Sequence, residues 1–153
     1  MIGTRVAAGV LAVVTLTGVA ACPTDEPANA KMSTAVVASK RPTESLKPLL
    51  EQRLPNVKGK AFTSVIVSFP PDARAKPHRH GEAFVYAYVL EGVVRSELAG
   101  KPAKTYREGE NWVEPPGSHH VLTENTSRTE PAKLLVVFVS NTGDKLKVDD
   151  PGS

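Results

Sequence analysis

The sequence predicts an all-β fold, an antiparallel sandwich or barrel in a single domain. Thirteen prolines and eleven glycines are spread along the 153 residues, a distribution that suits short strands joined by turns. From Lys60 onward, β-branched and aromatic stretches alternate with turn residues about every 8–12 positions. No stretch after residue 55 carries the apolar period of a helix. A chain of this length can bury the core of one ordinary domain.

Each expected strand ends at residues that favour a turn. The first stops at Pro70-Pro71, and Gly92, Gly100 and Gly109 follow later strands. In chain order, the expected strands are 61–69, 83–90, 93–98, a short segment around 105–106, 111–114, 119–125 and 132–139.

The borders of the domain are less regular than its centre. Residues 43–53 (TESLKPLLEQR) could form a short helix with Thr43 as its N-cap, although Pro48 limits its regularity. The leucines of this segment would share one face of that helix. We expect the barrel domain to span residues 41–145 and residues 146–153 to be a C-terminal tail.

The N-terminus is expected to be a secretory signal peptide over residues 1–21. Arg5 precedes a stretch of small and apolar residues, VAAGVLAVVTLTGVAA, which is short for a transmembrane span. An uncleaved membrane anchor is the alternative. Residues 22–40 mix Pro, Thr, Asp, Ser, Ala and Lys, and we expect them to be a linker.

Cys22 is the single cysteine and directly follows Val19-Ala20-Ala21. This resembles the bacterial lipobox, in which small residues precede a cysteine that becomes lipidated, although leucine is usual where Val19 stands. The resemblance implies an exported, periplasmic or cell-envelope lipoprotein that contacts the membrane only through a lipid anchor on Cys22. The alternative is a secreted protein that is cleaved after Ala30 and loses Cys22. Either way, one cysteine permits no disulfide within the chain.

The composition argues against nucleic acid as a partner. The formal net charge is +3, and no dense block of Lys and Arg with interleaved aromatics is present. The sequence also contains no Gly-rich phosphate-binding loop and no Ser/His/Asp set in a recognisable catalytic context.

All four histidines lie in two close pairs, His78/His80 and His119/His120. Residues two apart on a strand point to the same face, about 6–7 Å apart, so both imidazoles of the first pair can reach one ion. Neutral imidazole is a common protein ligand for Zn, Fe, Mn, Ni and Cu. By itself, however, a His-x-His pair can equally be an exposed polar pair on a loop. The histidines therefore predict a site for one divalent metal ion but do not identify the metal.

The segments around these pairs resemble the two motifs of the cupin superfamily. They read PHRHGEAFVYAYVLEG and GENWVEPPGSHHVLTEN, and the resemblance covers roughly residues 60–140. Most of the first motif is matched by His78, His80 and Gly92. The spacing of the second motif is matched in full by Gly109, Pro115, Gly117 and His120.

This resemblance implies a double-stranded β-helix, the cupin jelly-roll barrel, with one divalent metal ion inside it. The implied ligands are His78, His80 and His120. By the family spacing His120, not His119, is the ligand, and strand alternation places His119 on the opposite face.

The cupin pattern lacks its metal-binding glutamate in this chain. That residue should fall four or five positions after the second histidine, where Phe84 and Val85 stand. Glu82 is the nearest carboxylate and a candidate ligand, unless Gly81 breaks the strand before it. Glu114 is a second candidate, more plausibly as an outer acceptor that orients an imidazole N–H.

Three neutral ligands would leave a coordination position open and the full 2+ charge on the ion. Such a site favours a small, anionic ligand or a bound water of low pKa. We therefore expect a metal-dependent enzyme, a small-molecule dioxygenase or an isomerase. The alternatives are an exported cupin that binds a metal or small ligand without transforming it, and a domain whose site is vestigial. The resemblance also implies a homodimer, since dimers are common among small cupins.

Overall fold

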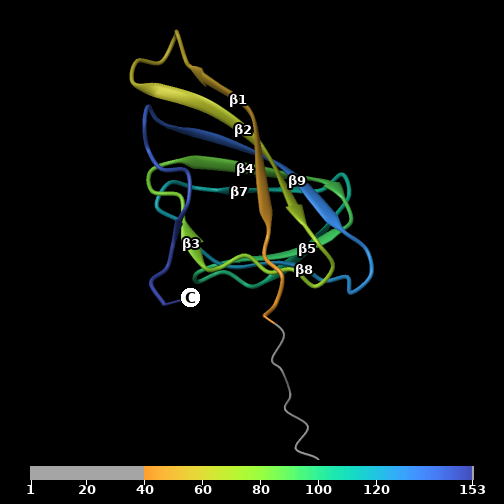
Figure 1. Ribbon diagram of the computed structural model, residues 1–153. Helices are drawn as coiled ribbons and strands as arrows, with labels where there is room; N and C mark the ends of the chain where they lie inside the picture. Colours follow the sequence, from red (N-terminus) through yellow and green to blue (C-terminus); the bar gives the residue numbers. More distant parts are fainter. Residues whose placement is uncertain (1–39, 153) are drawn as a thin grey trace, which may run out of the picture. The chain divides into compact units, whose positions relative to one another are not determined.

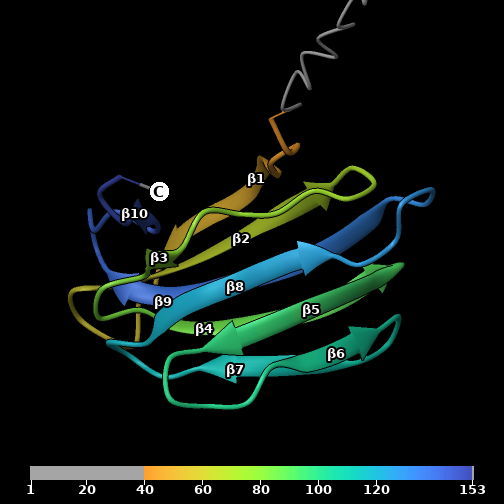
Figure 2. The same cartoon turned by 90° about the horizontal axis from the view of Figure 1, so that it is seen from below.

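Two five-stranded antiparallel sheets form the fold of the computed structural model, which describes residues 40–152 (Figure 1, Figure 2). The first sheet has the order β1-β2-β9-β4-β7 and the second has the order β10-β3-β8-β5-β6. The strands are β1 (Ser45–Arg53), β2 (Lys60–Phe69), β3 (His78–Arg79), β4 (Phe84–Glu91), β5 (Val93–Leu98), β6 (Lys104–Arg107), β7 (Asn111–Glu114), β8 (His119–Asn125), β9 (Ala132–Asn141) and β10 (Val148–Asp149).

The all-β prediction is confirmed, because every expected segment coincides with one of the strands β2 and β4 to β9. Residues 40–152 contain no helix, and hence no helix that is long and apolar enough to cross a membrane. The signal peptide, Cys22 and all but the last residue of the linker lie outside the described residues, so these remain predictions.

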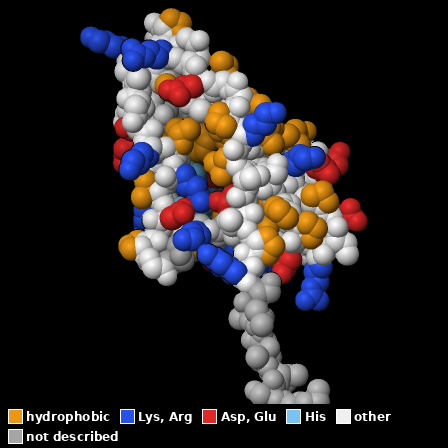
Figure 3. Space-filling model, viewed as in Figure 1, with side chains coloured by type: hydrophobic (Ala, Val, Ile, Leu, Met, Phe, Trp, Pro, Cys, Tyr) orange, Lys and Arg blue, Asp and Glu red, His pale blue; other side chains and the backbone are white. Residues whose placement is uncertain are grey.

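The short helix predicted for residues 43–53 is wrong, because this segment forms β1, an edge strand paired with β2. Pro48 lacks the N–H that a helix interior needs, whereas an edge strand tolerates it, and the β1–β2 register shifts just after it. Leu46, Leu49 and Leu50 are each about half exposed. Figure 3 shows hydrophobic side chains gathered on the face that β1 crosses.

Strand alternation supplies the core between the two sheets. β9 is paired along its length with β2 on one side and β4 on the other, so these three strands form the continuous wall of the first sheet. Their inward side chains pack with residues of β5 and β7. The buried cluster comprises Val65, Val67, Phe69, Ala73, Ala75, Ala83, Val85, Ala87, Val89, Val94, Trp112, Ala132, Leu134, Val136 and Phe138.

Gly92 forms the turn between β4 and β5 and has no room for a side chain. Its φ is +78°, and a Cβ at this position would lie 2.5 Å from the carbonyl oxygen of Pro131 and 3.0 Å from Cα of Ala132. The glycine of the first motif is therefore required both by the backbone conformation and by the close approach of the chain before β9.

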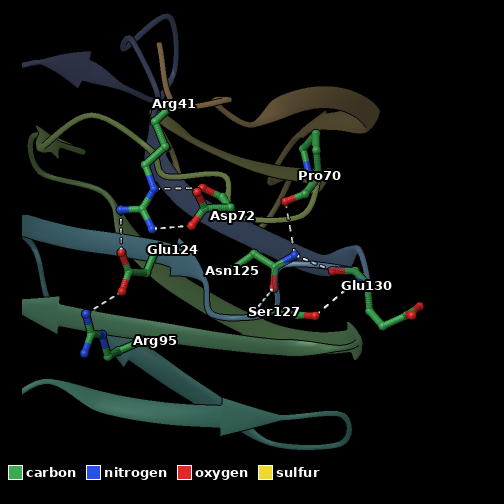
Figure 4. A network of polar contacts seen from close by, with 8 residues as sticks. All are labelled: Arg41, Pro70, Asp72, Arg95, Glu124, Asn125, Ser127 and Glu130. Carbon is green, nitrogen blue, oxygen red and sulfur yellow. Dashed lines mark hydrogen bonds and ion pairs between the residues drawn. The ribbon is translucent and has the colours of Figure 1, made fainter. Parts of the chain in front are cut away.

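A network of charged side chains fixes the start of the domain (Figure 4). Arg41 donates to the carbonyl oxygen of Asp72 at 2.8 Å and to its Oδ1 at 2.7 Å. The same guanidinium lies 3.2 Å from the buried carboxylate of Glu124 on β8, which also pairs with Arg95 of β5. These contacts position the segment that leads to Glu44. The side chain of Glu44 lines a cavity that His78 and His120 also line.

Candidate metal centre

Antiparallel pairing of β3 with β8 brings the two histidine pairs together. His78 lies opposite His120, and Arg79 lies opposite His119. Alternation buries His78 and exposes Arg79, and His80, which follows β3, is buried again. His78, His80 and His120 are 6%, 8% and 3% exposed, so all three imidazoles lie inside the domain.

The three buried imidazoles form one group. The ring centroids of His78 and His80 are 4.8 Å apart, and those of His78 and His120 are 5.1 Å apart. One ring nitrogen from each of the three lies within 4.8 Å of the other two. Donors at this spacing can share one ion after small side-chain adjustments, since metal–nitrogen bonds are about 2.0–2.1 Å long.

The turns that carry the two motifs are joined by the backbone. Gly81 and Gly117 both have positive φ, +55° and +79°, and the N–H of Gly117 donates to the carbonyl oxygen of Gly81 at 2.7 Å. This bond fixes the turn after His80 against the turn before His120, so the approach of the histidines does not depend on side chains alone.

Backbone carbonyls fix the orientation of two imidazoles. Nδ1 of His78 lies 2.6 Å from the carbonyl oxygen of Lys76, and Nδ1 of His80 contacts the carbonyl oxygen of Leu146. Because a carbonyl oxygen only accepts, each Nδ1 carries the proton, and each Nε2 presents a lone pair. Such outer contacts commonly orient histidine ligands of metals.

His120 is held by its other nitrogen. Its Nε2 lies 2.8 Å from Oγ of Ser96 and 2.7 Å from Oγ1 of Thr123, and its Nδ1 lies 3.1 Å from Oε1 of Glu114. The hydroxyls can accept from Nε2–H, which leaves the Nδ1 lone pair for an ion, or they can donate to Nε2 while Nδ1–H donates to Glu114. In both arrangements each ring nitrogen of His120 can be occupied. Only the arrangement with the proton on Nε2 leaves Nδ1 free to bind an ion.

Glu114 places a buried carboxylate beside the imidazoles. Its Oε1 accepts a bond from Nε1 of Trp112 at 3.0 Å, and its Oε2 lies 3.6 Å from Nε2 of His80. Burial by itself would raise the pKa of Glu114, but the hydrogen bond and charge of His120, the charge of His80 and the bond from Trp112 outweigh it and lower that pKa. The carboxylate is therefore ionised.

Burial keeps the first pair of histidines neutral. It is the main cause that lowers the pKa of His78 to about 4, and the neighbouring charges of His80, His120 and Lys147 act in the same direction. Burial also lowers the pKa of His80. Neutral imidazole is the form that binds a metal.

A cavity of about 70 Å³ adjoins the histidines, enough for an ion with a few waters or for a very small ligand. Apolar side chains form most of its wall, several of them from β2 and β9. Its polar lining residues include Glu44 and Lys147, which are joined by an ion pair of 2.7 Å. Lys147 also lies 2.7 Å from Asp149. Burial would lower the pKa of Lys147, but its bonds to Asp149 and Glu44 outweigh this effect and raise it.

Residues 146–149, which belong to the predicted C-terminal tail, contribute to this centre. β10 pairs with β3, with Asp149 opposite His78, and Leu146 supplies the carbonyl partner of His80. The sequence carried no signal for this return of the chain, because a short pairing of two residues has no recognisable period. No sequence motif marks Ser96 or Thr123 as partners of His120 either, although both are polar residues at inward positions of expected strands.

The remaining predicted residues lie outside the group. Glu82 is exposed in the turn after His80, away from the three imidazoles. His119 is half-buried on the other face of β8, as alternation predicts, and its Nε2 lies 2.7 Å from Oδ2 of Asp150.

Residues 65–138, which include all three buried histidines and Glu114, match the family model described as "Cupin domain". This match supports the cupin superfamily for residues 65–138. A search of curated protein sequences found no match.

Several solved structures have a similar fold. The cupin domain of Schizosaccharomyces pombe Cnp3 has a TM-score of 0.54 at 15% identity, over 69% of this chain and 66% of that chain. The lyase DddQ of Ruegeria pomeroyi, described as a DMSP lyase, has a TM-score of 0.59 at 19% identity, over 72% and 54%. An oxalate oxidase in complex with the substrate analogue glycolate has a TM-score of 0.57 at 22% identity, over 74% and 58%.

At these identities the likeness shows the fold alone. It agrees with the predicted double-stranded β-helix, whose two antiparallel sheets are seen here. This chain spans about half to two thirds of the length of the three proteins.

Proposed function

We propose that this cupin domain binds one divalent metal ion on His78, His80 and His120 and acts as a small-molecule dioxygenase-type oxidoreductase. The observation that carries the proposal is the convergence of three buried imidazoles whose outward nitrogens already have partners. Two of them present lone pairs inward, and the third does so when its proton lies on Nε2. A cation is the natural occupant of such a set.

The donor set fits iron, manganese, nickel, copper or zinc, since imidazole binds all five. A bound ion would supply Lewis-acid or one-electron chemistry. The chain's own residues hold the imidazoles in one orientation and surround the site with apolar side chains, which exclude bulk water. An oxalate oxidase and a DMSP lyase both share this fold, so the reaction test, and not the fold, decides between a redox and a non-redox reaction.

The ligand that fits this cavity is a small anion. Lys147 places an ammonium group in the wall, and the metal ion would add positive charge. In this structure the ammonium group of Lys147 forms ion pairs with Glu44 and Asp149. A carboxylate-bearing ligand would exchange with Glu44, whose side chain is 5% exposed. The volume of about 70 Å³ limits that ligand to a few non-hydrogen atoms.

The second candidate is an exported cupin that binds a metal or small ligand without transforming it. The small cavity favours this function, because it leaves little room for a substrate beside an ion. The same protein preparation distinguishes the two candidates. Elemental analysis identifies the metal, and oxygen uptake is followed with small enediol, catechol-like and hydroxy-acid compounds.

Iron, manganese, nickel or copper with oxygen uptake supports the oxidoreductase. Zinc without turnover, together with a ligand-induced rise in melting temperature, supports the binding protein. Loss of oxygen uptake in His120→Ala but not in His119→Ala ties the activity to the buried group. A protein that retains no metal after purification and reconstitution contradicts the oxidoreductase, and if it also shows no ligand-induced rise in melting temperature it contradicts the second candidate.

We also propose that the protein is exported, as a lipoprotein anchored on Cys22, and that it forms a homodimer. The exposed leucines of edge strand β1 suit contact with a second copy. Intact mass after expression in a bacterium tests lipidation, and light scattering tests the dimer. An unmodified full-length mass or a monomer contradicts the respective proposal.

A further inference from the structure

Glu114 stands where a neighbouring strand can replace the missing cupin glutamate. The family position falls at Phe84 or Val85 on β4, and β4 pairs with β7 so that Val85 lies directly opposite Glu114. Both side chains are buried, at 1% and 2% exposure. The apolar residue at the family position is therefore matched across the strand pair by an inward carboxylate.

The two oxygens of this carboxylate have different surroundings. Oε1 accepts the bond from Trp112 and contacts His120. Oε2 is buried and has no hydrogen-bond partner within residues 40–152. Buried polar atoms are nearly always paired, so an orphaned carboxylate oxygen in an otherwise ordered core requires a specific explanation.

The distances agree with a shared ion as that explanation. Oε2 lies 3.6 Å from Nε2 of His80, and Oε1 lies 3.1 Å from Nδ1 of His120. Two ligands about 2.1 Å from one ion are separated by about 3.0–3.4 Å at octahedral or tetrahedral angles. Oε2 is thus only slightly farther from Nε2 of His80 than two ligands of one ion would be, and the other oxygen of the same carboxylate lies within that range from Nδ1 of His120.

We infer that Glu114 is itself a metal ligand, through Oε2, so that β7 supplies the carboxylate that the first cupin motif lacks. The inference rests on the proposed metal site and changes its charge. With three neutral imidazoles and one carboxylate, the centre carries a net charge of 1+ in place of 2+. Oε1 meanwhile accepts the hydrogen bond from Trp112.

Cobalt binding to the full chain tests this role without reference to activity. Glu114→Gln keeps the size of the side chain and an oxygen that accepts from Trp112, but it removes the negative charge. We expect it to weaken Co²⁺ binding by about 100-fold, at the upper end of what loss of an outer contact produces, and to change the visible absorption of bound Co²⁺. Glu82→Gln, which removes an exposed carboxylate two residues from His80, is the matched control and should bind as the wild type does.

Moving the carboxylate back across the strand pair gives a second comparison. The double variant Glu114→Gln/Val85→Glu should recover at least about tenfold in Co²⁺ affinity over Glu114→Gln alone. A residue that only orients His120 through Oε1 would not be rescued from β4. Unchanged Co²⁺ absorption in Glu114→Gln, or no recovery in a folded double variant, overturns the inference.

The wild-type protein supplies a measurement that does not depend on how the variants fold. A crystal structure of the zinc-loaded protein should place a Glu114 oxygen about 2.0–2.2 Å from the ion. An ion held by the three histidines with that oxygen beyond about 3 Å overturns the inference and leaves the proposed function standing. Failure of the wild type to bind zinc or cobalt at all overturns both.

Discussion

Acid should destabilise the metal-free protein at a higher pH than its carboxylates alone would. Burial is the main cause that lowers the pKa of His78 from 6.5 to about 4. A group whose pKa falls on folding binds more protons in the unfolded state. Its contribution to stability is therefore complete above pH 6.5 and is lost as the pH falls toward 4. At about 1.4 kcal/mol per pH unit, this interval corresponds to about 3 kcal/mol.

The assay is urea unfolding of the chelator-treated protein at about pH 7.5 and about pH 4.5. Wild type should lose about 2–3 kcal/mol between them, and His78→Asn, which cannot titrate, should lose much less. Carboxylates with a lowered pKa, such as Glu44 and Glu114, titrate below their ordinary value of 4.5 and affect both proteins alike. The pKa of His80 is also lowered by burial, so protonation of His80 in acid destabilises the wild type and the variant alike. Equal losses in wild type and variant would refute the link between burial of His78 and acid sensitivity.

Three further predictions test the centre and its support. His120→Ala should abolish metal retention and His119→Ala should leave metal content nearly intact by elemental analysis; equal losses would show that the opposite faces of β8 are misassigned. Gly92→Ala should destabilise the fold by about 3 kcal/mol in urea unfolding, whereas Gly109→Ala, with a similar φ but no atom within 4 Å of the added Cβ, should cost about 1 kcal/mol; equal effects would contradict the close contact. Lys147→Met should weaken glycolate binding to the metal-loaded protein by about tenfold in calorimetry, and unchanged affinity would remove the ammonium group from the ligand site.

The strands of the barrel could be predicted because their signals are local. Alternating apolar residues and turn-forming glycines determine where β2 and β4 to β9 lie, and these depend only on neighbours in the chain. The helix prediction around Pro48 is wrong because three leucines at near-helical spacing belong to an exposed edge strand. Whether such residues face a core depends on what lies beside them, and no local pattern contains that information.

The same distinction separates the parts of the metal centre. His78 and His80 could be predicted as metal ligands from their spacing of two residues. His120 could be predicted as a ligand from the spacing of the second cupin motif. The position of Glu114 beside the imidazoles depends on β4 pairing with β7, which is a property of the whole sheet. Lys147 reaches the cavity through the return of the chain at β10, which is equally non-local.

The claim on which the centre depends is that imidazoles from two separate hairpins converge on one ion. X-ray absorption spectroscopy of the protein loaded with one equivalent of zinc measures this directly, because imidazole ligands give a characteristic outer-shell scattering pattern. We predict a signal from three imidazoles that is unchanged in His119→Ala. A wild-type spectrum with no more than one imidazole would contradict the convergence of His78, His80 and His120.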